Sequence, residues 1–342
     1  MIRDELSATI QKLLARGKGI LAADESNPTL TKRFHPLGIE STAESRRNYR
    51  EMLCSTPGLN EFVSGVILYD ETIRQRTRAG MPFPAALGEW GIIPGIKVDT
   101  GAKALAGSAG EKITEGLDGL RERLHEYHAM GARFAKWRAV IAIGDGIPTN
   151  YCVHTNMHAL ARYAALCHEA GMVPILEPEV TMDGDHEIER CHDSTESCLH
   201  ALFDELFAQN VELQYVMLKA NMVISGKDSP RQAGVGEVAD KTLDCMRNVV
   251  PASIPGIVFL SGGQSDELAT AHLNEMNRRE KHPWPLSFSY ARALQGPAMK
   301  AWRGEQASEE VGQQALYHRA RCNSAATLGR YSLAMEQAAL TK

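Results

Sequence analysis

Short apolar runs alternate with amphipathic helical patterns along most of the chain. Runs typical of strands occupy residues 20–23, 62–69, 92–98, 134–141, 172–180, 215–223, 256–260 and 285–289. Apolar residues recurring with a helical period stand between most of these runs, at 116–130, 157–170, 196–208 and 235–249. Strands that recur in step with helices indicate a parallel sheet.

The number of these units distinguishes an open sheet from a closed one. About eight strand–helix units in 342 residues favour a (β/α)8 or TIM barrel over an open doubly wound sheet. The turn after the first strand also lacks the G-x-G-x-x-G pattern of dinucleotide-binding folds. No linker divides the chain, so we expect residues 1–342 to form one α/β domain. A helix precedes the barrel, and a helical extension at 308–342 follows it.

Charged side chains interrupt several of the apolar runs, although a lone buried charge is costly. Lys219 lies in a run that otherwise reads as a buried strand. A lysine kept in such a place is usually paired, or its pKa is depressed and it acts as a nucleophile or base. Because strand side chains alternate between faces, Lys136 and Arg138 project together, and so do Glu177 and Glu179.

In barrels of this kind the active site lies at the C-terminal ends of the strands. The residues at those ends are Asp24, Lys97, Lys136, Arg138, Glu177, Glu179, Lys219, Ser261 and Arg292. Any one of them alone is most simply explained as a rim residue in a solvated salt bridge. Their accumulation at one end of the predicted barrel favours a catalytic centre.

Two of the lysines indicate covalent chemistry. If Lys136 and Lys219 lie close across the barrel, repulsion and partial burial lower the pKa of one of them. The neutral amine can then attack a carbonyl and form a Schiff base. Glu177 suits the proton transfers that formation and dehydration of the carbinolamine require.

A glycine pair after the seventh strand indicates a phosphate site. Ser261, Gly262 and Gly263 precede a helical pattern that begins near Asp266, where backbone N–H groups and the helix dipole favour an anion. The loops after strands seven and eight are the usual phosphate site of these barrels, and Arg292 is placed to clamp the same anion. The alternative explanation of the glycines is an ordinary turn.

Composition narrows the class of partner. A net charge of −5 and a pI near 6.2 give no general attraction to nucleic acid or anionic lipid. No apolar run approaches the roughly 20 residues that span a bilayer, and we expect neither a signal peptide nor a membrane segment. The seven cysteines are scattered without a CxxC pair, which favours free thiols in a reducing cytoplasm.

The 12 histidines raise the question of a metal site. His154 and His158 have the spacing of two ligands on one helix face, but the HExxH glutamate is absent. His186 and His192 lie in or beside an acidic loop. None of the four stands at a strand end, so surface histidines are the preferred interpretation and we expect no metal.

Together these segments resemble those of class I (Schiff-base) fructose-1,6-bisphosphate aldolases over nearly the whole chain. The motifs are GKGILAADES at 17–26, PGIKVD at 94–99, FAKWR at 134–138, EPE at 177–179, LKANM at 218–222, FLSGGQ at 259–264 and SFSYARAL at 287–294. The resemblance implies a (β/α)8 barrel, usually a homotetramer, that uses no metal or other cofactor. It also implies reversible cleavage of fructose 1,6-bisphosphate to dihydroxyacetone phosphate and glyceraldehyde 3-phosphate in glycolysis and gluconeogenesis.

The resemblance assigns roles to individual residues. Lys219 matches the Schiff-base lysine, Glu177 the acid–base glutamate, and Asp24 the aspartate at the C4 hydroxyl. Lys136 matches a lysine that supports the proton transfers, and Glu179 a supporting charge. The residues that match substrate-binding positions are Ser26, Thr29, Arg33, Lys97, Arg138, Ser261, Gly262, Gly263, Ser289 and Arg292.

The chain departs from the family pattern at a few positions. Ala220 follows the lysine where proline is commoner, and Ala291 precedes Arg292 where glycine is commoner. A Cβ at residue 291 would restrict a positive-φ backbone. Animal members end in a tyrosine that aids proton exchange on the enamine, whereas the last tyrosine here is Tyr331. The group that replaces the terminal tyrosine is left open.

Two alternatives share parts of this pattern. A metal-dependent aldolase would act on the same substrate but needs converging histidines. A non-catalytic phosphosugar-binding or scaffold barrel predicts loss of Lys219 or Glu177, and both are present. The sequence does not distinguish fructose 1,6-bisphosphate from fructose 1-phosphate as the preferred substrate.

Overall fold

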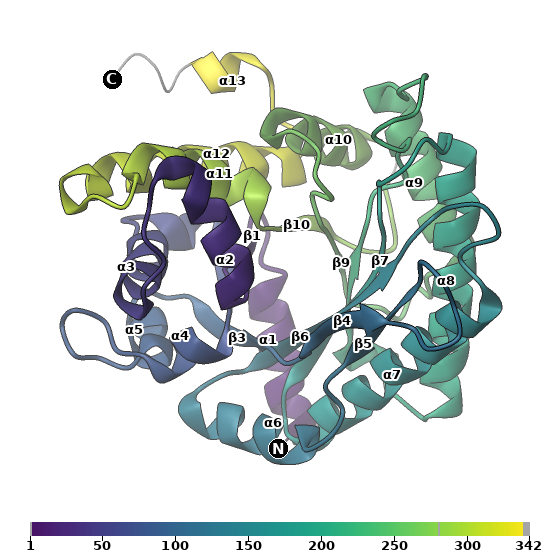
Figure 1. The fold of residues 1–342 in the computed structure, drawn as a ribbon, viewed down its shortest axis with the longest axis horizontal. Coiled ribbons are helices and arrows are strands. Elements are labelled where there is room, and N and C mark those ends of the chain that lie inside the picture. The colour runs from purple at the N-terminus through teal and green to yellow at the C-terminus, as the bar shows by residue number, and fades with distance from the viewer. Residues whose placement is uncertain (1, 280, 338–342) are drawn as a thin grey trace.

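Eight parallel strands close into a barrel, as the sequence predicts. A computed structural model describes residues 2–279 and 281–337 (Figure 1). The strands follow one another around the barrel in the order β1-β10-β9-β8-β7-β6-β3-β2. Their bounds are β1 (Gly19–Ala22), β2 (Val63–Leu68), β3 (Ile93–Lys97), β6 (Phe134–Ile141), β7 (Val173–Val180), β8 (Met217–Ala220), β9 (Ile257–Phe259) and β10 (Leu286–Tyr290).

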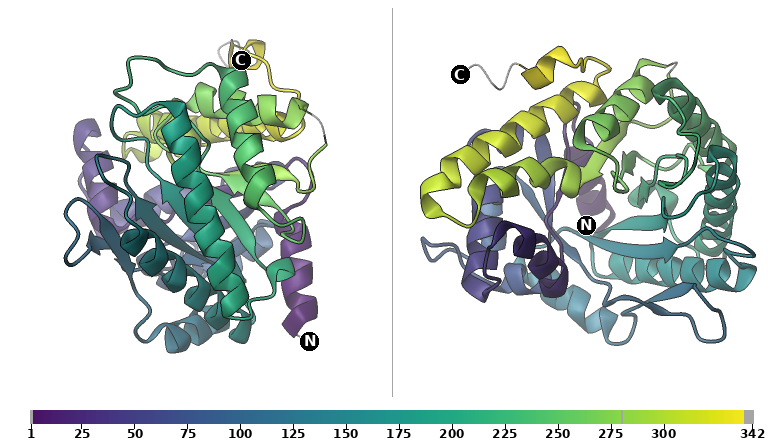
Figure 2. Two further views of the ribbon diagram at one scale, coloured as in Figure 1. Left: turned by 90° about the vertical axis from the view of Figure 1, so that its right-hand side faces the viewer. Right: turned by 45° about the horizontal axis from the view of Figure 1, so that its top comes forward.

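Helices surround the barrel on its outside (Figure 2, right). The helices between the early strands are α2 (Asn27–Phe34), α3 (Ala43–Cys54), α4 (Asp70–Arg74), α5 (Phe83–Glu89) and α6 (Leu120–Met130). The later ones are α7 (Asn150–Glu169), α8 (Ile188–Ala208), α9 (Val235–Val249), α10 (Asp266–Arg278), α11 (Arg292–Trp302) and α12 (Glu309–Thr327). Their apolar faces pack on the outer side of the strands and form one large buried cluster.

A second apolar cluster fills the amino-terminal end of the barrel. Helix α1 (Ile2–Leu13) places Leu6, Ile10 and Leu13 against residues from the barrel interior, including Phe134. Gly95 makes room for this packing, because a Cβ there would stand 2.2 Å from Cζ of Phe134. Helix α1 therefore closes this end of the barrel, which leaves the opposite end for a site.

The positions of most predicted elements are confirmed, although several boundaries move. Strand β8 ends at Ala220, earlier than the expected 223, because the backbone N–H of Val223 instead donates to Thr242 at 2.9 Å. Helix α7 begins at Asn150, ahead of the expected 157, because the Thr149 side chain caps it by accepting from the N–H of Cys152. Helix α8 likewise begins before the expected 196.

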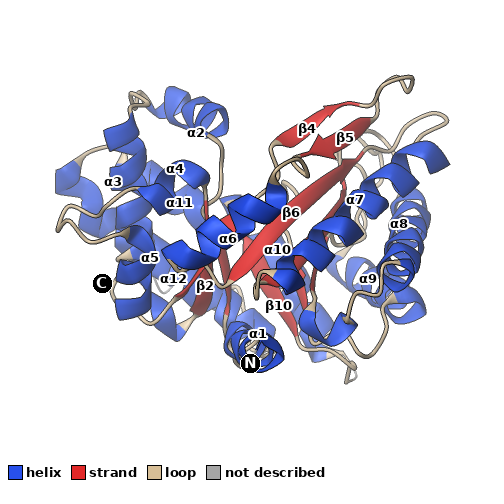
Figure 3. Cartoon of the chain, turned by 90° about the horizontal axis from the view of Figure 1, so that it is seen from below, coloured by secondary structure: helices blue, strands red, loops and turns tan. Residues whose placement is uncertain are grey.

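An antiparallel hairpin interrupts the alternation between β3 and β6. Its strands are β4 (Gly101–Ala104) and β5 (Lys112–Glu115), and it lies beside β6 (Figure 3). The strands are largely exposed and have no apolar alternation, so the hydrophobic pattern gives no signal for them. The hairpin nevertheless brings Gly101 and Ala102 to the rim of the barrel cavity.

The carboxyl-terminal segment continues the outer layer of helices. Helix α12 packs against α10, α11 and α3, and the short α13 (Ala334–Gln337) follows it. The last five residues of the predicted extension, 338–342, lie outside the described residues. Among the described helices, none combines the length and apolarity that crossing a membrane requires. All seven cysteines are buried and free within the described chain.

Candidate active site

The carboxyl ends of the strands enclose a cavity of about 320 Å³. All the predicted site residues line it except Gly263, which follows the lining residue Gly262 in the chain. The strand register explains the convergence, since Lys97 is paired with Lys136 across β3 and β6, and Arg138 with Glu177 across β6 and β7. Cavities of a few hundred Å³ with converging polar groups are the usual form of small-molecule sites.

Two lysines and two carboxylates form the floor of the cavity. Glu177 lies between the lysines, with Oε1 2.9 Å from Nζ of Lys219 and Oε2 3.0 Å from Nζ of Lys136. Oδ2 of Asp24 lies 2.8 Å from the same Lys136 nitrogen. All four residues are buried, so these ion pairs are little weakened by solvent.

The pKa shifts follow from this arrangement. Burial alone would raise the pKa of Asp24, but the ammonium groups of Lys136, Lys219 and Lys97 outweigh burial and hold it below its ordinary value. Burial likewise opposes ionisation of Glu177, and Lys136 and Lys219 again lower its pKa. The pKa of Lys136 is raised, because Asp24 and Glu177 overcome the effect of burial. For Lys136 this is the reverse of the lowering that repulsion between two lysines would produce.

Glycines shape the loop between β9 and α10. Gly262 has φ 58° and Gly263 has φ 90°, conformations that favour glycine over other residues. Ser265 then caps α10 by accepting from the N–H of Leu268 at 3.1 Å. The loop is therefore more than an ordinary turn: a Cβ at residue 263 would stand 3.2 Å from the guanidinium of Arg292.

Hydroxyl and guanidinium groups gather at this end of the cavity. Ser289, at the end of β10, is buried, and its Oγ has no hydrogen-bond partner among the described residues. Burial and then the positive charge of Arg33 lower the pKa of Arg292. Arg292 also forms no ion pair with any described residue. An unsatisfied hydroxyl beside two repelling guanidinium groups suits an anion.

The cavity also holds a second group of charges, from β3, β6 and β7. Nζ of Lys97 lies 3.9 Å from Oδ1 of Asp99 and 5.2 Å from the ring centre of Tyr69. The guanidinium of Arg138 forms an ion pair with Glu179. On the rim, the hydroxyls of Ser26 and Thr29 are 3.0 Å apart. Lys97 and Arg138 are thus held by carboxylates, whereas Ser26 and Thr29 are held by a hydrogen bond to each other.

The sequence did not predict two of the charged residues that line the cavity, Glu25 and Asp99. Glu25 forms ion pairs with Arg33 and with the fully buried Arg50, whose Nη2 lies 3.2 Å from Oε2 of Glu25. Asp99 accepts the backbone N–H of Arg138 at 3.3 Å. Both stand inside the motifs at 17–26 and 94–99, so a search for partners of the predicted cations would have found them.

The structure accommodates the residues that depart from the family pattern without positive-φ backbone strain, and it places Tyr331 outside the cavity. Ala291 has φ −101°, so its Cβ meets no positive-φ strain. The Ala220 carbonyl accepts the N–H of Leu260 at 2.9 Å. Tyr331 donates its hydroxyl to Glu336 at 2.8 Å and does not line the cavity. Asn221, which follows Lys219 closely, points away and bonds to Val180 and Thr195.

The histidines considered as metal ligands lie away from the cavity. His154 and His158 are exposed on α7, and Nδ1 of His158 lies 2.9 Å from Glu205. His192 lies 3.3–3.5 Å from Asp193, Glu196 and Asp244. Together with His186, none of these residues lines the cavity.

Comparison with known proteins finds fructose-bisphosphate aldolases by both the family match and the similar sequences. Residues 5–342 match the family model described as fructose-bisphosphate aldolase class-I. A probable fructose-bisphosphate aldolase class 1 of Xanthomonas campestris is 57% identical over 96% of this chain and 98% of that protein. Fructose-bisphosphate aldolase 1 of Toxoplasma gondii is 48% identical over 96% and 92%. Cytosolic fructose-bisphosphate aldolase 4 of Arabidopsis thaliana is 47% identical over 96% and 84%.

A solved structure extends the similarity to three dimensions. The fructose-bisphosphate aldolase of Plasmodium falciparum, crystallised with TRAP and a small-molecule inhibitor, superposes with a TM-score of 0.95 at 44% identity. The alignment covers 97% of this chain and 96% of that one.

Proposed function

The chain belongs to the class-I fructose-bisphosphate aldolase family and is a carbon–carbon lyase, and from this premise we propose that its reaction proceeds through a Schiff base on Lys219. The observation that carries the proposal is the position of Glu177, which lies 2.9 Å from the Lys219 nitrogen in a buried cavity. A carboxylate at that distance can accept and return the protons that imine formation requires.

The first half of the reaction uses these two residues. Nζ of Lys219 attacks C2 of fructose 1,6-bisphosphate, and the carbinolamine loses water to give an iminium ion. The ionised Glu177 first receives a proton from the Lys219 amine and then supplies a proton to the departing hydroxyl. The iminium is then the electron sink for the next step.

Carbon–carbon cleavage falls to Asp24. Its depressed pKa keeps it ionised at neutral pH, so it can accept the C4 hydroxyl proton. The C3–C4 electrons pass into the iminium, giving an enamine, and glyceraldehyde 3-phosphate leaves. Protonation and hydrolysis of the enamine release dihydroxyacetone phosphate and restore Lys219. Lys136 balances Asp24 and Glu177 throughout, because it lies within 3.0 Å of both.

We propose that two groups of cations in the cavity bind the two phosphates of the substrate. We assign the 1-phosphate to Ser261, Gly262, Gly263, Ser289, Arg33 and Arg292, because the cationic and unsatisfied groups gather there. We assign the 6-phosphate end to Lys97 and Arg138, with Ser26 and Thr29 on the rim and Glu179 holding Arg138.

We further propose that no metal takes part. The iminium withdraws electrons from C3–C4, which is the task a metal ion would perform in a metal-dependent aldolase. We also propose a homotetramer in the cytoplasm that binds sugar phosphates. The cytosolic relative from Arabidopsis thaliana supports the compartment. The non-catalytic barrel is not retained, because nothing in the comparisons supports it.

Borohydride trapping tests the mechanism. The protein is incubated with dihydroxyacetone phosphate and EDTA, reduced with borohydride, and mapped by peptide mass. A reduced triose adduct on Lys219 is expected, and Lys219→Met should lose both the adduct and the cleavage activity. An adduct on Lys136 would identify Lys136, and not Lys219, as the nucleophile. No adduct, together with cleavage that EDTA abolishes, would replace the mechanism with metal catalysis.

A further inference from the structure

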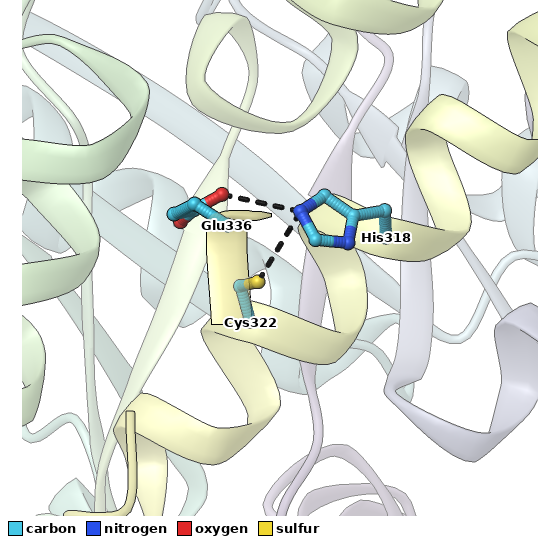
Figure 4. A group of neighbouring side chains, drawn as sticks. All are labelled: His318, Cys322 and Glu336. Atoms are coloured by element: carbon cyan, nitrogen blue, oxygen red, sulfur yellow. Dashed lines mark hydrogen bonds and ion pairs between the residues drawn. The ribbon is translucent and has the colours of Figure 1, made fainter. Parts of the chain in front are cut away.

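A group of metal-ligating side chains lies outside the active site, where α13 meets α12. His318 and Cys322 are one turn apart on α12, and Glu336 comes from α13 (Figure 4). Their ligand atoms all lie within 4.8 Å of one another. Cys322 is buried, whereas His318 and Glu336 are partly exposed, so an ion has a route from solvent. None of the three lines the catalytic cavity.

The distances in this group match a tetrahedral ion. Nε2 of His318 lies 3.2 Å from Oε2 of Glu336 and 3.7 Å from Sγ of Cys322. With zinc bonds of about 2.0–2.1 Å to N and O and about 2.3 Å to S, tetrahedral angles separate N from O by about 3.3 Å and N from S by about 3.6 Å. The remaining separation, between the ligand atoms of Glu336 and Cys322, is at most 4.8 Å and is about 3.6 Å in such a site. A closing movement of about 1 Å would therefore place one ion between the three atoms.

The surroundings of Glu336 leave one oxygen for an ion. Its Oε1 forms an ion pair with Arg319 and accepts the Tyr331 hydroxyl at 2.8 Å, while Oε2 faces His318. Arg319 is itself fixed, because Nη2 donates to the Asp266 carbonyl at 2.9 Å. Such outer contacts orient a ligating carboxylate in metal sites generally.

From this geometry we propose that His318, Cys322 and Glu336 bind one zinc ion, which fastens α13 to α12. Imidazole, thiolate and carboxylate are all accepted zinc ligands, and three protein ligands leave the fourth position to water. The site lies outside the catalytic cavity and takes no part in aldol chemistry. It fixes the chain at Glu336, immediately before the last segment of the sequence.

An assay of this site must detect both metal binding and a bond from the metal to the Cys322 thiolate. Cysteine binds zinc as the thiolate, so metal binding releases the thiol proton. The full-length protein is therefore stripped with EDTA, exchanged into buffer, and titrated with Zn²⁺ against a chromophoric chelator. A parallel titration with Co²⁺ reports the thiolate through its sulfur-to-metal charge-transfer band.

We expect one Zn²⁺ per chain and a Co²⁺ charge-transfer band. Cys322→Ser should abolish the band and weaken Zn²⁺ binding by roughly tenfold or more, and Glu336→Gln should weaken it similarly. The matched control is His158→Gln, because His158 has a glutamate 2.9 Å away but belongs to no three-ligand group among the described residues. This variant should keep the full affinity.

The outcomes separate clearly. Binding that survives in Cys322→Ser and Glu336→Gln, or binding without a charge-transfer band, would overturn the proposal, and so would the absence of stoichiometric binding. Because Cys322 is buried, circular dichroism must show that Cys322→Ser is folded. If Cys322→Ser is unfolded, the zinc affinity of Glu336→Gln, a change at a more exposed position, tests the proposal.

Discussion

At the scale of single residues, the central feature is a carboxylate held between two ammonium groups. Glu177 contacts Lys219 with one oxygen and Lys136 with the other, at 2.9 and 3.0 Å. The pairing offsets the cost of placing these groups in a buried site, where a single unpaired charge would be expensive. The sequence shows that these charges interrupt apolar strands, but not which carboxylate faces which lysine.

Glu177→Gln tests the acid–base role of this carboxylate. The amide keeps the shape of the side chain but cannot accept a proton, so we expect turnover to fall by about 10²–10⁴-fold, the usual contribution of general acid–base catalysis. Rapid-quench measurement of imine formation checks the step. A normal rate of imine formation in this variant would exclude Glu177 from carbinolamine chemistry.

Arg292→Ala tests the phosphate assignment. Loss of a charge-assisted hydrogen bond should cost about 1.5–3 kcal/mol of transition-state binding for fructose 1,6-bisphosphate. Fructose 6-phosphate, which lacks the 1-phosphate, should lose much less. Steady-state kcat/KM for both substrates decides the matter, and an equal loss for both would remove Arg292 from the 1-phosphate end.

At the scale of secondary structure elements, close packing at the amino-terminal end of the barrel constrains β3. Gly95 lies against the Phe134 ring of β6, with no room for a methyl group. This contact comes from strands that pair side by side but lie about 40 residues apart in the sequence. The apolar pattern located both strands, whereas the need for glycine appears only when the barrel is closed.

Gly95→Ala should therefore destabilise the protein. A Cβ 2.2 Å from the Phe134 ring forces a shift of packed groups, which typically costs about 1–3 kcal/mol of unfolding free energy. Gly88→Ala in α5 is the matched control, since its added methyl group would meet no described atom within 4 Å beyond its chain neighbours and the backbone of its own helix. The control should be neutral or gain up to about 1 kcal/mol from helix propensity. Urea unfolding of both variants measures the difference, and equal stabilities would contradict this explanation.

At the scale of the whole molecule, burying a charged site in the barrel makes stability depend on pH. Asp24 has a lower pKa folded than unfolded, because Lys136, Lys219 and Lys97 outweigh its burial. Its contribution to stability is therefore fully present above the unfolded pKa of about 3.9 and is lost as the pH falls below that value.

This linkage predicts how the free energy of unfolding depends on pH under acidic conditions. The free energy of unfolding of the wild type should fall more steeply below about pH 4 than that of Asp24→Asn, which cannot titrate at this position. Chemical unfolding at a series of pH values measures both slopes. Asp145→Asn, at an exposed position, controls for loss of one negative charge. Parallel slopes in the wild type and Asp24→Asn would remove Asp24 as a source of acid lability.

The sequence by itself determined the barrel and most of the residues around its cavity. Periodicity is a local property, so the runs of strand and helix are legible along the chain, and charges such as Lys219 stand out within them. The exposed hairpin of β4 and β5 has no such periodicity, and it was missed.

Only the tertiary structure decided which side chains meet. Glu25 contacts Arg50, Glu177 bridges two lysines, and Glu336 reaches His318 through contacts between separate elements. Such pairings depend on barrel closure, strand register and the packing of α13 on α12. The physical reason is that a side-chain contact of about 3 Å is fixed by the position of both backbones, whereas a sequence pattern specifies only the direction in which each side chain points along its own element.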